Sequence, residues 1–276
     1  MGKKLEVLGL LLCLFVLTLG AGAGYGQSII DGYVDDWGID LTASGADMIG
    51  YLDTHHPSGG LDIDYVTEDN TDKYKKWREV GPLWSYYNWF DAEALYFDND
   101  QSYAYIALIT GMPEGGYQAP DYPLFDGGDI AIDVDNDPTT GEYGFEYGID
   151  IFAGELKAVD DWQDVYYSEG SAANPYRILS HSSSTPIDFV YSGVQNSHYV
   201  LEARFPLSYL ELSAEPGDLV HRLKIHWAEE CGNDFLTLNA DVNPVFVPEP
   251  STFVLFGLGA LGLFGYGWKR RKQTKK

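Results

Sequence analysis

The chain has 276 residues and a formal net charge of −25, from 42 Asp and Glu against 17 Lys and Arg. Such an acidic surface repels phosphate backbones and anionic lipids, which argues against nucleic acid as a partner. Divalent cations are plausible partners for such an acidic surface. The alternative is that the negative charge only keeps the protein soluble. Aromatic residues make up 15% of the chain, enough apolar surface to fold, so the composition excludes a disordered protein.

The first 26 residues are predicted to be a secretory signal peptide. Lys3 and Lys4 precede an apolar run at residues 8–19, and residues 21–23 (Ala-Gly-Ala) offer a small-residue cleavage site. Cleavage after Gly26 fits as well, and an uncut signal anchor is the alternative. The sequence therefore predicts export by the general secretion machinery, with signal peptidase as a transient partner.

Residues 27–246 contain short β-rich runs broken by Asp, Gly, Asn and Pro clusters, a pattern typical of an all-β protein. The predicted strands lie at or within residues 28–37, 94–97, 104–109, 129–134, 143–152, 199–205 and 222–228. We expect one helical turn at residues 206–211, a loop region at residues 50–90 and a connection at residues 168–186. The predicted fold is an antiparallel β-sandwich of jelly-roll or immunoglobulin-like type.

An acidic turn between two of these runs offers oxygen ligands for a metal ion. Asp133, Asp135 and Asp137 fall on one side if the strand continues, and Ca²⁺ prefers carboxylate and carbonyl oxygens. Glu146 and Asp150 on the returning run are candidates to complete the site. The alternative is an acidic turn whose carboxylates are satisfied by water and by their own backbone amides.

Aromatic residues cluster before the first predicted hairpin. Trp84, Tyr86 and Trp89 form a candidate carbohydrate platform, because flat rings stack on the C–H faces of sugars. Packing inside the fold is the alternative, since aromatic side chains dominate protein cores. Acidic pairs are too frequent for their spacing to single out a glycosidase site. We therefore predict that the protein is not an enzyme.

The last thirty residues form a signal in three parts. Pro248, Glu249 and Pro250 hold an extended peptide, and sixteen uncharged residues follow at 253–268. As a helix at ~1.5 Å per residue this stretch spans roughly 24 Å, short of the ~30 Å hydrocarbon core, which favours a temporary transmembrane anchor. The basic cluster that fixes its orientation consists of Lys269, Arg270, Arg271 and Lys272. An ordinary single-pass tail anchor is the alternative.

This tail, residues 247–276, resembles the PEP-CTERM sorting signal of Gram-negative bacteria. The resemblance implies recognition by exosortase, a membrane-embedded cysteine peptidase. It also implies a precursor held in the inner membrane, followed by delivery to the cell surface or extracellular matrix.

The body carries a second resemblance. Residues 31–37, 95–109, 128–133 and 199–210 look like strands and turns of family 9 carbohydrate-binding modules. Residues 91–112, 128–150 and 226–236 look like those of exported, exosortase-dependent surface proteins. These likenesses imply a sandwich fold and an exported destination.

Two hypotheses for the function of the body follow. The first is a non-enzymatic surface or matrix protein that binds exopolysaccharide. The second is a structural or adhesive protein whose acidic turn binds calcium and which has no sugar site.

Overall fold

The computed structural model describes residues 28–41, 57, 63–67, 90, 92–118, 121–166, 172–191, 198–212, 221–232 and 234–242. The predicted signal peptide, the predicted membrane helix and the sorting signal lie outside these ranges. Among the described residues, no helix is long and apolar enough to cross a membrane. Residues 1–243 form one compact unit, which contains every strand of the structure, and residues 244–276 form a second.

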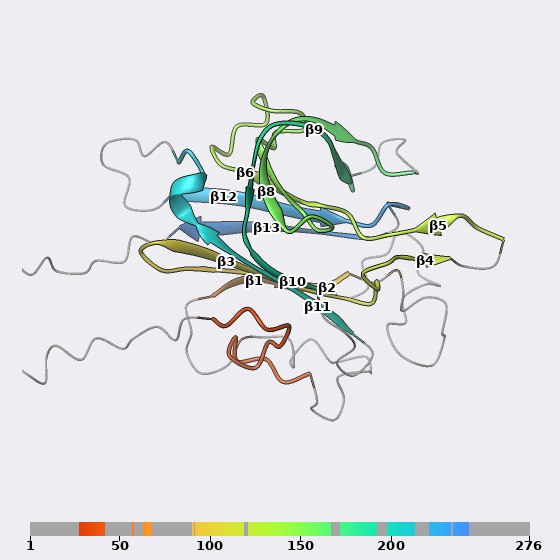
Figure 1. Cartoon of the computed structure of the whole chain (residues 1–276), viewed down its shortest axis with the longest axis horizontal. Helices are drawn as coiled ribbons and strands as arrows, with labels where there is room; N and C mark the ends of the chain where they lie inside the picture. The colour runs from red at the N-terminus through yellow and green to blue at the C-terminus, as the bar shows by residue number, and fades with distance from the viewer. Residues whose placement is uncertain are drawn as a thin grey trace, which may run out of the picture. The chain divides into compact units, whose positions relative to one another are not determined.

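The first sheet has five antiparallel strands in the order β1-β2-β3-β11-β10 (Figure 1). Its strands are β1 (Asp64–Thr67), β2 (Ala92–Asn99), β3 (Tyr103–Thr110), β10 (Asp188–Tyr191) and β11 (Tyr199–Pro206). The β2–β3 hairpin and β11 form its centre, which leaves the four-residue β10 as an edge strand.

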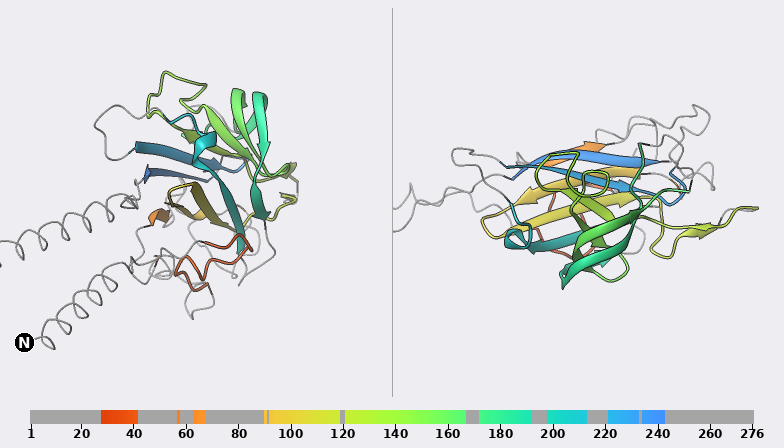
Figure 2. Two further views of the ribbon diagram at one scale, coloured as in Figure 1. Left: turned by 60° about the vertical axis from the view of Figure 1, so that its left-hand side comes forward. Right: turned by 90° about the horizontal axis from the view of Figure 1, so that it is seen from above.

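The second sheet has six antiparallel strands in the order β13-β12-β6-β7-β8-β9. They are β6 (Ile130–Asp133), β7 (Tyr147–Asp150), β8 (Glu155–Gln163), β9 (Arg177–Pro186), β12 (His221–Ala228) and β13 (Phe235–Val242). The β8–β9 pair curves away from β12 and β13, as Figures 1 and 2 show. A small hairpin, β4 (Tyr117–Gln118) with β5 (Leu124–Phe125), stands apart from both sheets.

The main core lies between the two sheets. The first sheet contributes buried side chains such as Leu95, Phe97, Ile106, Leu108 and Leu201, and the second contributes Ile130, Ile132, Leu223, Ile225 and Trp227. Inward residues alternate with outward ones because successive side chains of a strand point to opposite faces. The predicted all-β fold with antiparallel sheets is confirmed, and the shared core gives it the two layers of a sandwich.

Most predicted strands are present, but the prediction of a brief strand within residues 28–37 was wrong, since these residues form bends and turns. The runs at 94–97, 104–109, 199–205 and 222–228 fall within β2, β3, β11 and β12, and the turn at 206–211 contains the short 3-10 helix η4 (Leu207–Tyr209). The expected strand at 143–152 begins late, because β7 starts at Tyr147.

The expectation of a connection at residues 168–186 was wrong for its second half, which forms the ten-residue β9. Most of β9 is exposed, and its sequence is rich in Ser. It pairs with β8 alone, at the edge of the second sheet. A strand with little buried surface lacks the apolar alternation on which the sequence prediction depended.

The outer face of the first sheet is covered by residues 28–41, which we call the N-terminal strap. Val34, Trp37, Ile39 and Leu41 of the strap are buried against outward side chains of β2, β3 and β11 in a second apolar cluster. In Figure 1 the strap is drawn in red, on the side of the first sheet away from β12 and β13. The central strands of the first sheet are therefore buried on both faces.

A single carboxylate of β11 holds the strap. Glu202 is fully buried, and its Oε2 accepts hydrogen bonds from the backbone N–H of Asp31 (3.0 Å) and Gly32 (2.6 Å). Its Oε1 accepts the indole N–H of Trp37 at 2.9 Å. Gly32 has a φ of +84°, a backbone conformation that favours glycine and that turns two successive amides toward one oxygen. Burial raises the pKa of Glu202 to about 7, because desolvation of the charge outweighs these three donors.

Replacing Glu202 with Ala should release the strap, because three buried donors lose their acceptor. We expect the free energy of unfolding to fall by roughly 3 kcal/mol, since hydrogen bonds to a charged group contribute about 1.5–3 kcal/mol each. Urea denaturation measures the change. Glu211→Ala, at an exposed position, is the control and should stay within about 0.5 kcal/mol of the wild type. Equal midpoints for Glu202→Ala and the control would contradict this role.

The same carboxyl predicts a pH dependence. Its pKa is raised in the folded chain, so the stability it contributes is complete below its unfolded value and is lost as the pH rises through about 7. Between about pH 5 and pH 8, the wild type should lose up to about 3 kcal/mol relative to Glu202→Gln, which has no proton to release there. Urea denaturation of both proteins across this range tests the difference.

Two other buried groups, Asp129 and His226, also make the stability depend on pH. Their contributions cancel when the wild type is compared with Glu202→Gln. Burial raises the pKa of Asp129 to about 6, which acts in the same direction as Glu202, and lowers that of His226 to about 4, which acts in the opposite one. Both groups are present in the wild type and in the variant. Parallel pH profiles of the two proteins would therefore refute the assignment to Glu202.

Candidate functional site

The acidic turn begins where β6 ends. Asp133, the last residue of β6, is fully buried, and its Oδ1 accepts the backbone N–H of Asn136 at 2.6 Å. Asp135 Oδ1 accepts the N–H of Asp137 at 2.8 Å, and Asp137 Oδ1 accepts the N–H of Thr139 at 2.9 Å. Each carboxylate thus satisfies a backbone donor further along the chain, which is why this Asp-rich sequence forms a compact turn.

Asp133, Asp135 and Glu146 come together, each offering a carboxylate oxygen within 4.8 Å of the other two. Glu146 arrives from the returning chain, and its Oε2 accepts the N–H of Val134 at 3.0 Å. The β6–β7 register explains this meeting: Ile132 faces Tyr147, which places Glu146 opposite Asp133 one residue further along.

The hydroxyl of Thr140 lies in the middle of this group. Its Oγ1 is 2.9 and 3.0 Å from the two carboxylate oxygens of Asp135, 2.7 Å from Glu146 Oε1 and 2.9 Å from the carbonyl of Asp137. One hydroxyl proton cannot serve four acceptors. The remaining oxygens face one another, and a hard cation is the ligand that such a cluster of oxygens suits.

A lysine already neutralises part of this charge. Lys224 Nζ lies 2.8 Å from Asp133 Oδ2 and 4.6 Å from the centre of the Phe145 ring. His221 Nε2 contacts the carbonyl of Val134 beside it. Since the charge of Asp133 is already paired with an ammonium group, a cation would depend mainly on the carboxylates of Asp135 and Glu146.

Two of the five acidic residues that the sequence offered as metal ligands, Asp137 and Asp150, direct their carboxylates away from this cluster. The carboxylate of Asp137 turns toward Thr139, whose hydroxyl and amide lower the pKa of that carboxyl, and only its carbonyl faces the cluster. Asp150 pairs with Lys157 at 2.6 Å at the other end of β7. Thr140 and Lys224 were not anticipated, because the sequence does not show which strands are neighbours.

The candidate sugar residues Trp84, Tyr86 and Trp89 lie outside the described residues, as do all residues of the sorting signal. The next described residue, Phe90, belongs to a group of aromatic rings. Its ring centre is 5.9 Å from that of Tyr117 and 6.1 Å from that of Phe125. Phe90 therefore packs against one ring from each strand of the β4–β5 hairpin.

Comparison with known protein families gives one match. Residues 246–272 match the family model of the PEP-CTERM protein-sorting motif. The chain ends in a PEP-CTERM sorting motif. The motif implies sorting by exosortase, and with it export to the cell surface or an extracellular location in bacteria. It covers only the tail, so it assigns a destination and leaves the function of the sandwich open.

No curated protein matches the chain. Among solved structures, it is similar to a family 9 carbohydrate-binding module from Caldicellulosiruptor kristjanssonii in complex with cellotriose. The identity is 14%, the match covers 78% of this chain and 80% of that one, and the TM-score is 0.26, which is too low to assign a fold or a ligand to this chain.

Proposed function

We propose that this protein is a non-enzymatic component of the cell surface or extracellular matrix of a Gram-negative bacterium, and that its sandwich binds exopolysaccharide. The observation that carries the destination is the sorting motif at residues 246–272. In this proposal residues 1–26 direct secretion and are removed by signal peptidase. The apolar residues 253–268 then hold the precursor in the inner membrane as a transmembrane helix.

The three parts of the tail have separate roles in this proposal. Pro248 and Pro250 keep the segment extended and accessible to exosortase, because neither can enter a helix interior. Glu249 provides the charge that the peptidase recognises. The basic cluster at residues 269–272 stays on the cytoplasmic side and fixes the orientation of the helix.

Two buried titratable groups, Asp129 and His226, support a structural role for the interior of the sandwich. Asp129 accepts the backbone N–H of Ile151 (3.1 Å) and of Ile178 (2.9 Å), so it ties β6 to the β7–β8 turn and to β9. His226 contacts Thr237 Oγ1 (2.9 Å) and the carbonyl of Ala173 (3.0 Å). These groups position backbone, as expected of groups that serve the fold.

Changing Glu249 and Pro250 together to Ala should block processing. We expect the unprocessed precursor to accumulate in the inner membrane and surface delivery to fall at least tenfold. Membrane fractionation and intact mass of the protein measure both effects. Ser251→Ala, the adjacent control, should be processed as the wild type. Normal mass and normal delivery of the double variant would refute exosortase sorting through this peptide.

Calcium binding is the second candidate function, and the oxygen cluster around Thr140 favours it. Asp133, Asp135 and Glu146 supply carboxylates, Asp137 supplies a carbonyl and Thr140 a hydroxyl. Water would complete the 6–8 oxygen ligands that Ca²⁺ takes. Such a site would fasten the β6–β7 turn and let an acidic protein act as a structural or adhesive subunit.

Millimolar calcium should raise the melting temperature of the wild type by about 5 °C, because a ligand at a hundred times its Kd stabilises by about 2.7 kcal/mol. Asp135→Asn with Glu146→Gln should abolish the rise. Asp121→Asn, at an exposed position in the β4–β5 loop, is the control and should keep it. Differential scanning calorimetry with and without chelator measures the shift. An equal rise in the double variant would exclude this site.

A further inference from the structure

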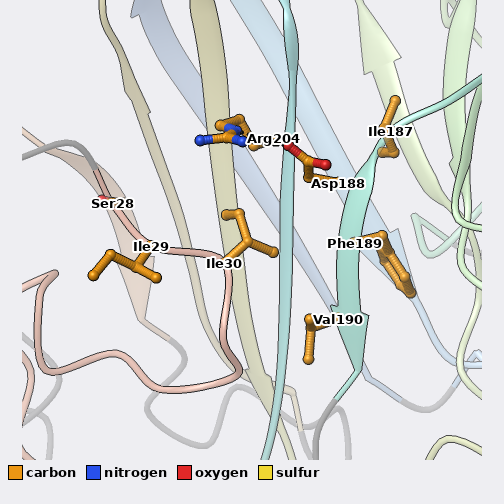
Figure 3. A pocket seen from close by; sticks show the side chains of 8 residues that line it. All are labelled: Ser28, Ile29, Ile30, Ile187, Asp188, Phe189, Val190 and Arg204. Atoms are coloured by element: carbon orange, nitrogen blue, oxygen red, sulfur yellow. Dashed lines mark hydrogen bonds and ion pairs between the residues drawn. The ribbon is translucent and has the colours of Figure 1, made fainter.

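A groove lies on the outer face of the first sheet, at the edge of the N-terminal strap. Its volume is about 540 Å³. Figure 3 shows the side chains that line it. Ser28, Ile29 and Ile30 of the strap line one side, and Asp188 and Val190 of β10 line the other. Arg204 of β11 also lines it. The strap is packed over β2, β3 and β11, and the groove is the step between the strap and the edge strand β10.

A charged pair presents hydrogen-bonding groups to this groove. Arg204 faces Asp188 in the β10–β11 register, and its Nε and Nη2 both donate to the same oxygen, Asp188 Oδ2, the first at 3.0 Å. Within the described chain, Asp188 Oδ1 and Arg204 Nη1 make no hydrogen bond. The guanidinium lies 5.3 Å from the centre of the Tyr103 ring, a contact that restricts its orientation. An acceptor and a donor thus lie side by side, already oriented.

The other side chains that line the groove are uncharged, and all of them except Ser28 are apolar. Ile30 packs against the strap's own cluster, and Val190 lies on the same face of the sheet as Asp188. Ile29 is 61% exposed. In Figure 3 the side chains of Ile187 and Phe189 point away from the strap, and both pack against the main core. A ligand here would meet aliphatic side chains on its flat faces and the Asp188–Arg204 pair at its rim.

We propose that this groove binds a neutral, hydroxyl-rich glycan. Two neighbouring hydroxyls of a sugar ring fit the pair, because one can donate to Asp188 Oδ1 while the other accepts from Arg204 Nη1. The C–H faces of the ring would contact Ile30 and Val190. The volume falls within the range of about 300–1,000 Å³ that ligand sites occupy. This inference rests on the proposed polysaccharide binding and gives it a site and a class of ligand.

The charge of the groove and of the whole chain favours a neutral glycan over an anionic one. Asp188 neutralises the one cation of the groove, and the whole chain carries a formal net charge of −25. A polysaccharide rich in uronate or sulfate would be repelled, whereas a neutral one would not. An extended peptide fits less well, since it would add to the backbone edge of β10, whereas the free hydrogen-bonding groups here are side chains on the sheet face.

Affinity electrophoresis of the full-length protein in detergent tests the site. The probes are three neutral polysaccharides (dextran, mannan and hydroxyethylcellulose) and anionic alginate. We expect at least one neutral probe to retard the wild type and alginate to have no effect. Arg204→Met should weaken retardation about tenfold, through the loss of a charged hydrogen bond. Asp188→Ala, which removes the acceptor, should weaken it as well.

The matched control is Arg222→Met. Arg222 also pairs across strands with an aspartate, Asp241, at 3.4 Å, but on the second sheet and away from the groove. It should bind as the wild type does. Urea denaturation identifies which variants are folded. If only one of Arg204→Met and Asp188→Ala is folded, the retardation of that variant is compared with that of the control.

Three results would overturn the proposal. The first is no retardation by any neutral probe. The second is retardation unchanged in the Arg204 and Asp188 variants but lost on Trp84→Ala with Trp89→Ala, which would leave the proposed polysaccharide function standing at another site. The third is binding of an extended (Thr-Val)₄ peptide in place of the glycans. The Glu249 and Pro250 double variant tests sorting separately. A failure of the sorting hypothesis can therefore be distinguished from a failure of the proposal that the groove binds a glycan.

Discussion

The carboxylate of Glu202 is the interaction on which the arrangement of this sandwich depends. It accepts hydrogen bonds from the backbone N–H groups of Asp31 and Gly32 and from the indole N–H of Trp37. These donors precede Glu202 by 165 to 171 positions in the chain. A buried carboxylate without these donors would be costly, because its charge would lose the groups that replace water. The contact therefore places the strap, and the strap converts the outer face of the first sheet from exposed surface into a second core. Where the strap ends, the sheet is left uncovered, and the groove beside β10 is the result.

Buried charges act in the same way elsewhere in the fold. Asp129 joins three segments through backbone amides, and Lys224 joins β12 to the end of β6 through Asp133. Each of these contacts links parts of the chain that are distant in sequence. In a chain with 42 acidic residues, such carboxylates hold strands, turns and the strap to one another, while the exposed ones keep copies of the protein apart. Both roles suit a protein that is sorted to a surface and has to remain folded there.

Strands with buried apolar side chains could be predicted, and the exposed edge strand β9 could not. β12 alternates apolar and polar residues because the main core lies on one of its faces, whereas β2, β3 and β11 place apolar residues on both faces because the strap covers the second one. β9 carries Ser where an inner strand carries Ile or Val, since almost nothing packs on it. The acidic turn shows the same limit. Asp133, Asp135 and Asp137 were predicted as ligands from their spacing, but the turn directs the Asp137 carboxylate to Thr139. Of the two further candidates, Glu146 and Asp150, the strand register brings only Glu146 to the site.

The sequence by itself determined the features that neighbouring residues encode, namely the sorting motif and the β-rich character of the body. The sorting motif is read in order along an extended peptide and an apolar run, and the β-rich body follows from local alternation and turn residues, so neither requires knowledge of distant contacts. Only the tertiary structure decided which oxygens surround Thr140, which amides meet Glu202 and where Asp188 and Arg204 open into a groove. These depend on strand order and register, which arise from packing of the whole sheet and join residues far apart in the chain.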